Sequence, residues 1–350
     1  MKTLHVIIML VFAGFLAPGW SGAADKVVVI PLMSHQSKPL KNVVTVAKKN
    51  GDFTDPVAAV NSITDAAVDN PYLIVIGPGV YTLTEALQIP GYVSMTGSGL
   101  YSTTLQGTLS DDQSLFTGSL VRLAGGHSSL SDLFVTNRGG GKRSTAVFVG
   151  YNSELHQLSV QVSGSEENVG VYSNGGKVEH VSILATGGER ATGILSYSSQ
   201  PPIKHISITA HNAHQINIGV DFSGSARLLS DAEINATGDT YAIGVRYKDC
   251  RNSEVLDGVR IQAAGAGESR GIFSYTQNHF SPVVLKRSTV FGEDRAILVQ
   301  NYSNTNNITL IRASQSTIVG GVEISGNGGE KSECIACDDN SGHELNSVCE

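Results

Sequence analysis

One phrase decides the fold of this chain, and three of its copies read Gly170-Val171-Tyr172-Ser173, Gly193-Ile194-Leu195-Ser196 and Gly219-Val220-Asp221-Phe222. Further copies begin at Ala146, Gly244, Gly271, Ala296 and Gly321, so that successive copies start 23 to 27 residues apart. Each copy is a small residue followed by the alternating pattern of a short strand. Repeats of about 20 to 50 residues indicate solenoids, propellers or arrays. Because a propeller blade requires about 40 residues or more, the spacing predicts a solenoid of short coils.

The composition favours one long domain of stacked coils. The chain has 350 residues, of which 39 are Gly and 16% are charged. A solenoid grows by adding coils, so a single domain accommodates this length. The formal net charge is -7, and no basic cluster offsets it, which argues against binding nucleic acid through its phosphates.

The first residues resemble an export signal. Lys2 supplies the charged start, the run from Val6 to Phe15 is apolar, and Ser21-Gly22-Ala23 offers small residues at a cleavage site. The apolar run is too short for a membrane span, and no second long apolar segment follows. We therefore predict a signal peptide at 1–23, a leader segment at 24–41, a solenoid at 42–330 and a Cys-containing tail at 331–350. The expected location is secreted, periplasmic or on the cell surface.

A single helix is predicted between Asp52 and Ala67. Asp55 is a suitable N-cap, Pro56 follows at the first helical position, and Val57, Val60, Ile63 and Ala67 recur on one face. The first coil of a solenoid exposes backbone donors and apolar side chains, so we expect this helix to cover it.

The segment from residue 50 to residue 107 carries a resemblance to a known superfamily. Its residues are Gly51-Asp52-Phe53-Thr54, Ile74-Val75-Ile76, Gly79-Val80-Tyr81, Gly97-Ser98-Gly99 and Thr103-Thr104-Leu105. This pattern resembles the N-terminal part of the pectin-lyase-like right-handed parallel β-helix proteins, and of pectin methylesterases in particular. The coils extend the likeness through residue 324. The resemblance implies an all-β fold, a single right-handed parallel β-helix with an N-terminal capping helix.

The catalytic motifs of the methylesterases are missing from this chain. The resemblance would place a pair of Asp in motifs such as Gln-Asp-Thr-Leu and Asp-Phe-Ile-Phe-Gly, and neither occurs. The only Trp is Trp20, inside the predicted signal. The esterase residues are therefore not carried over to this sequence.

Asp221 and Arg246 are the best candidates for catalysis, if the protein is an enzyme. They occupy the same position in consecutive copies of the repeat, and both point outward if Val220 and Phe222 point inward. Pectate-lyase chemistry requires clustered Asp residues that bind calcium and a nearby basic residue that takes a proton, and this pair is the best remnant of such an arrangement. The alternative is an ordinary ion pair between coils, which contributes little on a surface.

Aromatic residues also face outward from these strands, at this position and two residues further on. The expected ligand-binding residues are Phe148, Tyr172, Tyr197, Phe273 and Tyr275. Soluble surfaces seldom display contiguous apolar patches without a use, so the rings would stack on sugar faces. The alternative is that loops or the leader segment cover them.

A polar column precedes the second strand of each coil and comprises Asp132, Gln157, His180, His205 and Asp231. In related β-helices such positions often carry stacked Asn at a turn, so we interpret the column as a turn ladder. The alternative is a metal site at His180 and His205. We predict no metal site and no cofactor.

The chain has four cysteines, Cys250 and three near the end. In an oxidising compartment we expect a disulfide in which Cys349 pairs with Cys334 or Cys337. The alternative is a zinc site that uses the Cys334-Ile335-Ala336-Cys337 motif and His343.

The complete repeat without catalytic motifs predicts an exported, non-catalytic β-helix protein that binds polysaccharide or cell-surface glycan. The first alternative is a divergent polysaccharide-acting enzyme, an esterase or a lyase, working at Asp221 and Arg246. The second is a structural stalk, adhesin-like or spike-like, without a preferred ligand. No nucleic-acid partner and no membrane span are expected.

Overall fold

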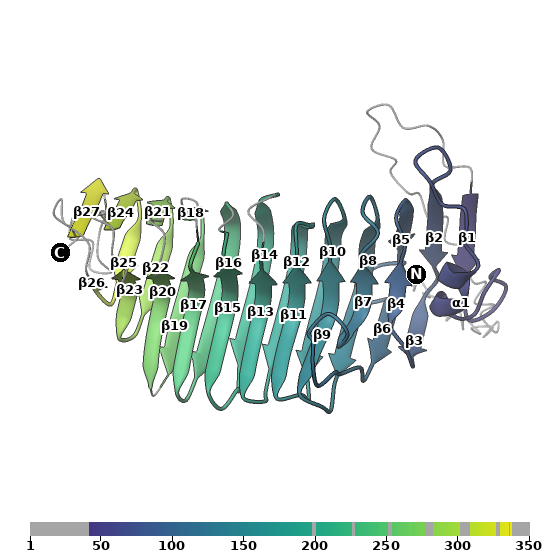
Figure 1. Cartoon of the computed structure of the whole chain (residues 1–350), viewed down its shortest axis with the longest axis horizontal. Helices are drawn as coiled ribbons and strands as arrows, with labels where there is room; N and C mark the ends of the chain where they lie inside the picture. The colour runs from purple at the N-terminus through teal and green to yellow at the C-terminus, as the bar shows by residue number, and fades with distance from the viewer. Residues whose placement is uncertain are drawn as a thin grey trace, which may run out of the picture. The chain divides into compact units, whose positions relative to one another are not determined.

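The computed structural model describes residues 42–197, 201–225, 228–250, 254–265, 267–276, 283–301, 309–326, 330–335 and Cys337. The predicted signal and leader, and Cys349, lie outside the described residues. Almost every element is a strand, and every pairing between named strands is parallel (Figure 1).

One sheet carries the repeated phrase and has ten strands among the described residues. We call it the ten-stranded sheet. Its strands are β4 (Leu87–Ile89), β7 (Ser119–Leu123), β9 (Arg143–Val149), β11 (Glu167–Ser173), β13 (Arg190–Ser196), β15 (Ile216–Ser223), β17 (Tyr241–Lys248), β20 (Glu268–Thr276), β23 (Arg295–Asn301) and β26 (Val322–Gly326).

The strands between these form the second parallel sheet, with seventeen strands among the described residues. They are β1 (Asn42–Val46), β2 (Tyr72–Ile76), β3 (Gly79–Leu83), β5 (Val93–Thr96), β6 (Thr103–Gly107), β8 (Ser129–Arg138), β10 (Glu154–Ser163), β12 (Lys177–Thr186), β14 (Ile203–His211), β16 (Leu229–Gly238), β18 (Glu254–Asp257), β19 (Arg260–Gly265), β21 (Val283–Lys286), β22 (Thr289–Gly292), β24 (Thr309–Ser314), β25 (Thr317–Val319) and β27 (Glu330–Ile335). Because β27 pairs with β24, the coils continue past residue 330 into the stretch assigned to the tail.

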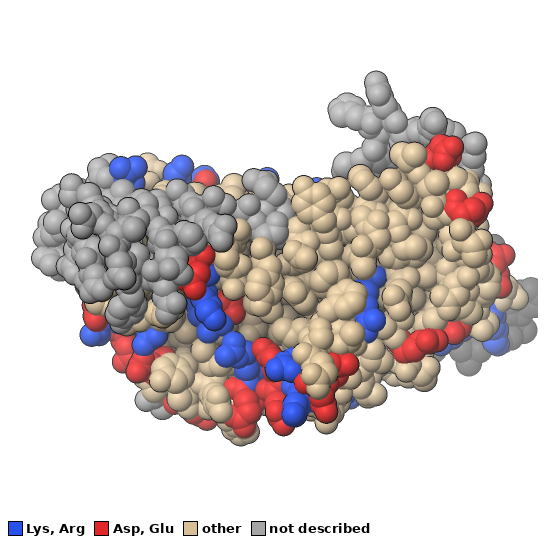
Figure 2. Space-filling model, in the orientation of Figure 1, with Lys and Arg blue, Asp and Glu red and all other residues tan. Residues whose placement is uncertain are grey.

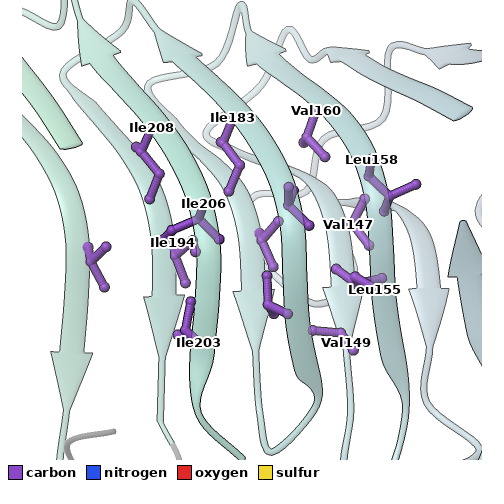
Figure 3. Close-up of a cluster of buried hydrophobic side chains, with 14 of the residues drawn as sticks. Val147, Val149, Leu155, Leu158, Val160, Ile183, Ile194, Ile203, Ile206 and Ile208 are labelled. Carbon is purple, nitrogen blue, oxygen red and sulfur yellow. The ribbon is translucent and has the colours of Figure 1, made fainter. Parts of the chain in front are cut away.

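The register confirms the repeat read from the sequence. Val171 pairs with Ile194, and Ile194 with Val220, so equivalent positions of successive copies are direct neighbours. These side chains are fully buried between the two sheets. Figure 3 shows Val147 and Ile194 of one sheet, and Leu158 and Ile206 of the other, pointing into the space between the two sheets. The chain is therefore a parallel β-helix with a continuous aliphatic core.

In four central copies of the phrase, the glycine is required sterically. A Cβ on Gly193 would lie 2.3 Å from Cγ2 of Ile208 and 2.6 Å from the carbonyl oxygen of Gly219. Gly170, Gly219 and Gly244 meet an isoleucine Cγ2 in the same way. The glycine therefore lets the two sheets approach each other closely at this point of the coil.

The helix α1 (Pro56–Asn61) is shorter than the predicted span. Its start is as expected, because Oδ1 of Asp55 accepts a hydrogen bond of 3.0 Å from the backbone of Val57. The prediction that it extends towards Ala67 is wrong, because it ends where Ser62 and the β-branched Ile63 and Thr64 lower helix propensity. The helix lies beside β1 and β2 at the N-terminal end of the coils (Figure 1). In the described part of the chain, no helix has the length and apolar character to cross a membrane.

The polar column is a ladder of left-handed residues, as the turn interpretation predicts. The φ angles of its members are 58° at Asp132, 49° at Gln157, 53° at His180, 51° at His205 and 51° at Asp231. One such residue bends each long strand of the seventeen-stranded sheet. The rings of His180 and His205 stack with centroids 4.6 Å apart. Among the described residues, no group of three or more His, Cys, Asp or Glu is arranged to hold a metal ion.

The cysteines that the structure describes lie inside the coils. Cys250 and Cys337 are each 1% exposed, and Sγ of Cys250 lies 3.7 Å from the carbonyl oxygen of Phe222. The side chain of Cys334 is outside the described atoms, as is Cys349, so the disulfide pairing stays a prediction.

Candidate functional site

The outer face of the ten-stranded sheet aligns five of the seven predicted site residues in one column, and Tyr197 and Tyr275 come two residues further along the chain. Direct partners in the ladder are Phe148 with Tyr172, Asp221 with Arg246, and Arg246 with Phe273. Leu195 stands between Tyr172 and Asp221 in the same register. The flanking residues Val220 and Phe222 belong to the core, so this column points outward. We call it the outer column.

Asp221 and Arg246 form a two-point ion pair at the centre of the outer column. Nε of Arg246 lies 2.9 Å from Oδ1 of Asp221, and Nη2 lies 2.5 Å from Oδ2. Asp221 is 4% exposed, although it points away from the core. Paired hydrogen bonds to both oxygens make this the strong, directional form of an Arg–carboxylate contact. The Asp221–Arg246 pair therefore differs from the exposed ion pair of little energetic weight that the sequence analysis gave as the alternative.

The aromatic residues before this pair pack edge to face in a row. Ring centroids are 4.7 Å apart for Phe116 and Phe148, 5.1 Å for Phe148 and Tyr172, and 5.7 Å for Tyr172 and Tyr197. Phe148 is only 7% exposed, so neighbouring groups cover its ring. Tyr197 is 48% exposed and supported by Tyr172. The sequence left open whether these rings are exposed or covered. Both cases occur on this face, because Phe148 is covered and Tyr197 is exposed.

The phenol groups of Tyr172 and Tyr197 are held in the neutral form. Burial raises the pKa of Tyr172. Burial is also the main cause that raises the pKa of Tyr197, and its electrostatic interactions with the neighbouring phenol of Tyr172 and the carboxylate of Asp221 add to it. A phenol with a raised pKa keeps its proton at neutral pH and can donate a hydrogen bond to a ligand.

On the C-terminal side of the ion pair, the outer column has a cation–π contact between Arg270 and Phe273. The guanidinium of Arg270 lies 4.5 Å from the ring centroid of Phe273. The rings of Phe273 and Tyr275 are 6.5 Å apart and tilted, and both residues are partly exposed. A hollow of about 320 Å³ opens here, with Leu298 of the outer column in its wall. Phe273 is thus less accessible to a sugar face than Tyr197.

Arginine–carboxylate pairs border the outer column. Arg143 lies 3.2 Å from Glu167, Arg190 lies 4.0 Å from the same carboxylate, and Arg295 lies 2.6 Å from Glu323. Arg270 is paired with Glu268. Figure 2 shows acidic and basic side chains side by side in the viewed face, amid a largely uncharged surface. The sequence reasoning missed these residues, although they recur at the starts of the ten-stranded sheet's strands.

Similarity to known proteins is confined to the fold. No family model matches the chain, and no curated protein matches it in sequence. Among solved structures, the A-module of a mannuronan C-5 epimerase from Azotobacter vinelandii has a TM-score of 0.53 at 14% identity, covering 81% of this chain and 91% of that one. The catalytic unit of a GH87 alpha-1,3-glucanase from Streptomyces thermodiastaticus has a TM-score of 0.53 at 10% identity, covering 88% of this chain and 65% of that one. These likenesses and the parallel coils show that the chain has the right-handed parallel β-helix fold.

Proposed function

We propose that this protein is an exported, non-catalytic β-helix protein that binds glycan on the outer face of the ten-stranded sheet. The observation that carries the proposal is the half-exposed Tyr197, which stands on Tyr172 near the Asp221–Arg246 pair. An exposed ring next to fixed polar groups suits a sugar, because it offers an apolar face together with hydrogen-bonding partners. The similar structures support a glycan as the ligand, since an epimerase of mannuronan and an alpha-1,3-glucanase have the same fold.

The carboxylates of this face favour binding over catalysis. Both oxygens of Asp221 are held by Arg246, and Glu167, Glu268 and Glu323 are each paired with an arginine. A general acid, base or nucleophile requires an oxygen within reach of the substrate and a pKa suited to the proton transfer. A carboxylate locked in an ion pair serves instead to fix the arginine that would contact the ligand.

The test compares Tyr197→Ala with Tyr101→Ala on affinity gels that contain immobilised glycans. Tyr101 is fully exposed and lies outside the outer column, so it is a matched control for the loss of a surface tyrosine. We expect retention by at least one glycan in the wild type and in Tyr101→Ala, and lost retention in Tyr197→Ala. Equal retention of the two variants would contradict the proposed face.

Catalysis is tested separately by incubation with pectin, polygalacturonate and alginate. We expect no methanol, no unsaturated product and no change in uronate configuration. Any of these, if abolished by Asp221→Asn, would establish the enzyme alternative at Asp221 and Arg246. Absence of binding to a broad glycan panel would favour the structural stalk.

A further inference from the structure

A second pocket lies on the turns that lead from the ten-stranded to the seventeen-stranded sheet. It has a volume of about 370 Å³, within the range of small-ligand pockets. Its walls come from four successive turns, with His127, Tyr151, Gly175 and Pro201 each supplied by a different one. None of these residues belongs to the outer column or to its ion pairs.

A glycine fixes the aromatic wall of this pocket. A Cβ on Gly175 would lie 2.5 Å from Cδ2 of Tyr151, so only a glycine allows the tyrosine to lie against this turn. Gly175 also has a φ of 86°, which favours glycine independently. Tyr151 is nevertheless 66% exposed. One side of the tyrosine therefore rests on the backbone of the next coil, and the remainder is open to a ligand.

Hydrogen bonds between coils hold the rest of the pocket in place. The backbone of His127 donates to the carbonyl of Asn152 at 2.7 Å, and the backbone of Lys177 donates to the carbonyl of Ser153 at 2.8 Å. Beneath them, the buried hydroxyls of Ser128 and Ser153 are 2.9 Å apart. A site formed before binding loses less conformational entropy when a ligand enters.

The charges of the pocket favour a neutral ligand. Glu154 is exposed, and no ion pair of Glu154 is found among the described residues. Lys177 is its partner in the ladder, but the Lys177 ammonium lies 3.1 Å from Glu179 instead. The basic group is thus already neutralised, and the carboxylate of Glu154 remains. An acidic sugar would be repelled by it, whereas the hydroxyls of a neutral sugar can donate to it.

We propose that this pocket binds one neutral pyranose unit of a glycan. The exposed part of Tyr151 packs on the C–H face of the sugar ring, the amide of Asn152 bonds to hydroxyl groups, and Glu154 accepts hydroxyl hydrogens. This assignment does not depend on the outer-column site, and each can fail without the other.

The experiment titrates the ¹⁵N-labelled mature protein with neutral tetrasaccharides of glucose, mannose, galactose and xylose, and with tetragalacturonate. Binding is followed by amide shifts of the turn at 150–153 and its neighbours. We expect at least one neutral tetrasaccharide to bind there more tightly than tetragalacturonate. Tyr151→Ala should weaken it by about tenfold, as for an aromatic residue central to a binding site.

Three variants make the result specific. Tyr151→Phe keeps the ring and should bind within about twofold of the wild type, as should the exposed control Tyr101→Ala. Tyr197→Ala should leave this pocket unchanged, even if it abolishes binding at the outer column. The proposal is overturned if no neutral tetrasaccharide shifts these amides, if Tyr151→Ala binds like the wild type, or if tetragalacturonate binds here as tightly.

Discussion

Arg246 on β17 donates one hydrogen bond to each carboxylate oxygen of Asp221 on β15, and the two residues are direct partners in the parallel ladder. The pair lies on the outer side of the sheet, yet the side chains are only 17% and 5% exposed. Removing one member would leave the other charge partly buried without its partner, which is the costly way to break such a pair.

Asp221→Ala is therefore expected to lower the free energy of unfolding by about 3 kcal/mol. Arg143→Ala, which removes a more exposed arginine from Glu167, should cost about 1 kcal/mol or less. Urea denaturation followed by circular dichroism measures both. Similar losses in the two variants would show that the buried pair contributes no more to stability than the exposed one.

The glycine of the repeat gives a steric prediction. Gly193→Ala should destabilise the fold by about 2 kcal/mol, because its Cβ would collide with Ile208 and with the backbone of Gly219. Gly140 is the matched control, since a Cβ there meets nothing within 4 Å. Gly140→Ala should be neutral or slightly stabilising, through a lower entropy of the unfolded chain. Equal melting temperatures for the two variants would show that the sheets can separate at Gly193 without cost.

The raised pKa values of Tyr172 and Tyr197 predict a dependence of stability on alkaline pH. The folded state holds these phenolic protons more tightly than the unfolded chain, in which tyrosine has a pKa of about 10. Their contribution to stability is complete below that pH and is lost as the pH rises from there through the raised values. Phenolate absorbance measures the titration. The double variant Tyr172→Phe/Tyr197→Phe should show a smaller late component, to which Tyr72 and Tyr81 still contribute because their pKa values are also raised. If the wild type differs from the double variant only by two tyrosines that titrate at the usual pKa, the prediction is refuted.

The coils and their register were predictable because the repeat encodes them directly. Equivalent positions in consecutive phrases become neighbours, so the contact between Asp221 and Arg246 followed from spacing alone. The inward ladder followed from alternation, since Val171 and Ile194 carry the apolar side chains that the core requires. Both inferences need only local sequence and the geometry of a parallel strand.

The exposure of the site was not predictable in the same way. Phe148 is covered partly by Phe116, which comes from an irregular segment outside the repeat. The pocket at Tyr151 depends on the left-handed backbone of Asn152 and Gly175, which alternation does not reveal. The only sequence signal for it is the glycine pair at Gly175-Gly176 after a strand, which marks a turn without indicating what packs on it.

Substitutions at His180 distinguish the two interpretations of the polar column, a turn ladder or a metal site. His180 has a φ of 53°, which Asn adopts at little cost but a β-branched residue does not. We expect His180→Asn to keep the melting temperature, and His180→Val to lose about 1 to 2 kcal/mol of stability. If the column serves as a turn alone, EDTA and added zinc should leave the melting temperature of the wild type unchanged. A rise with zinc that disappears in His180→Asn would instead establish a metal site at His180 and His205, because a ligand that binds only the folded state stabilises it.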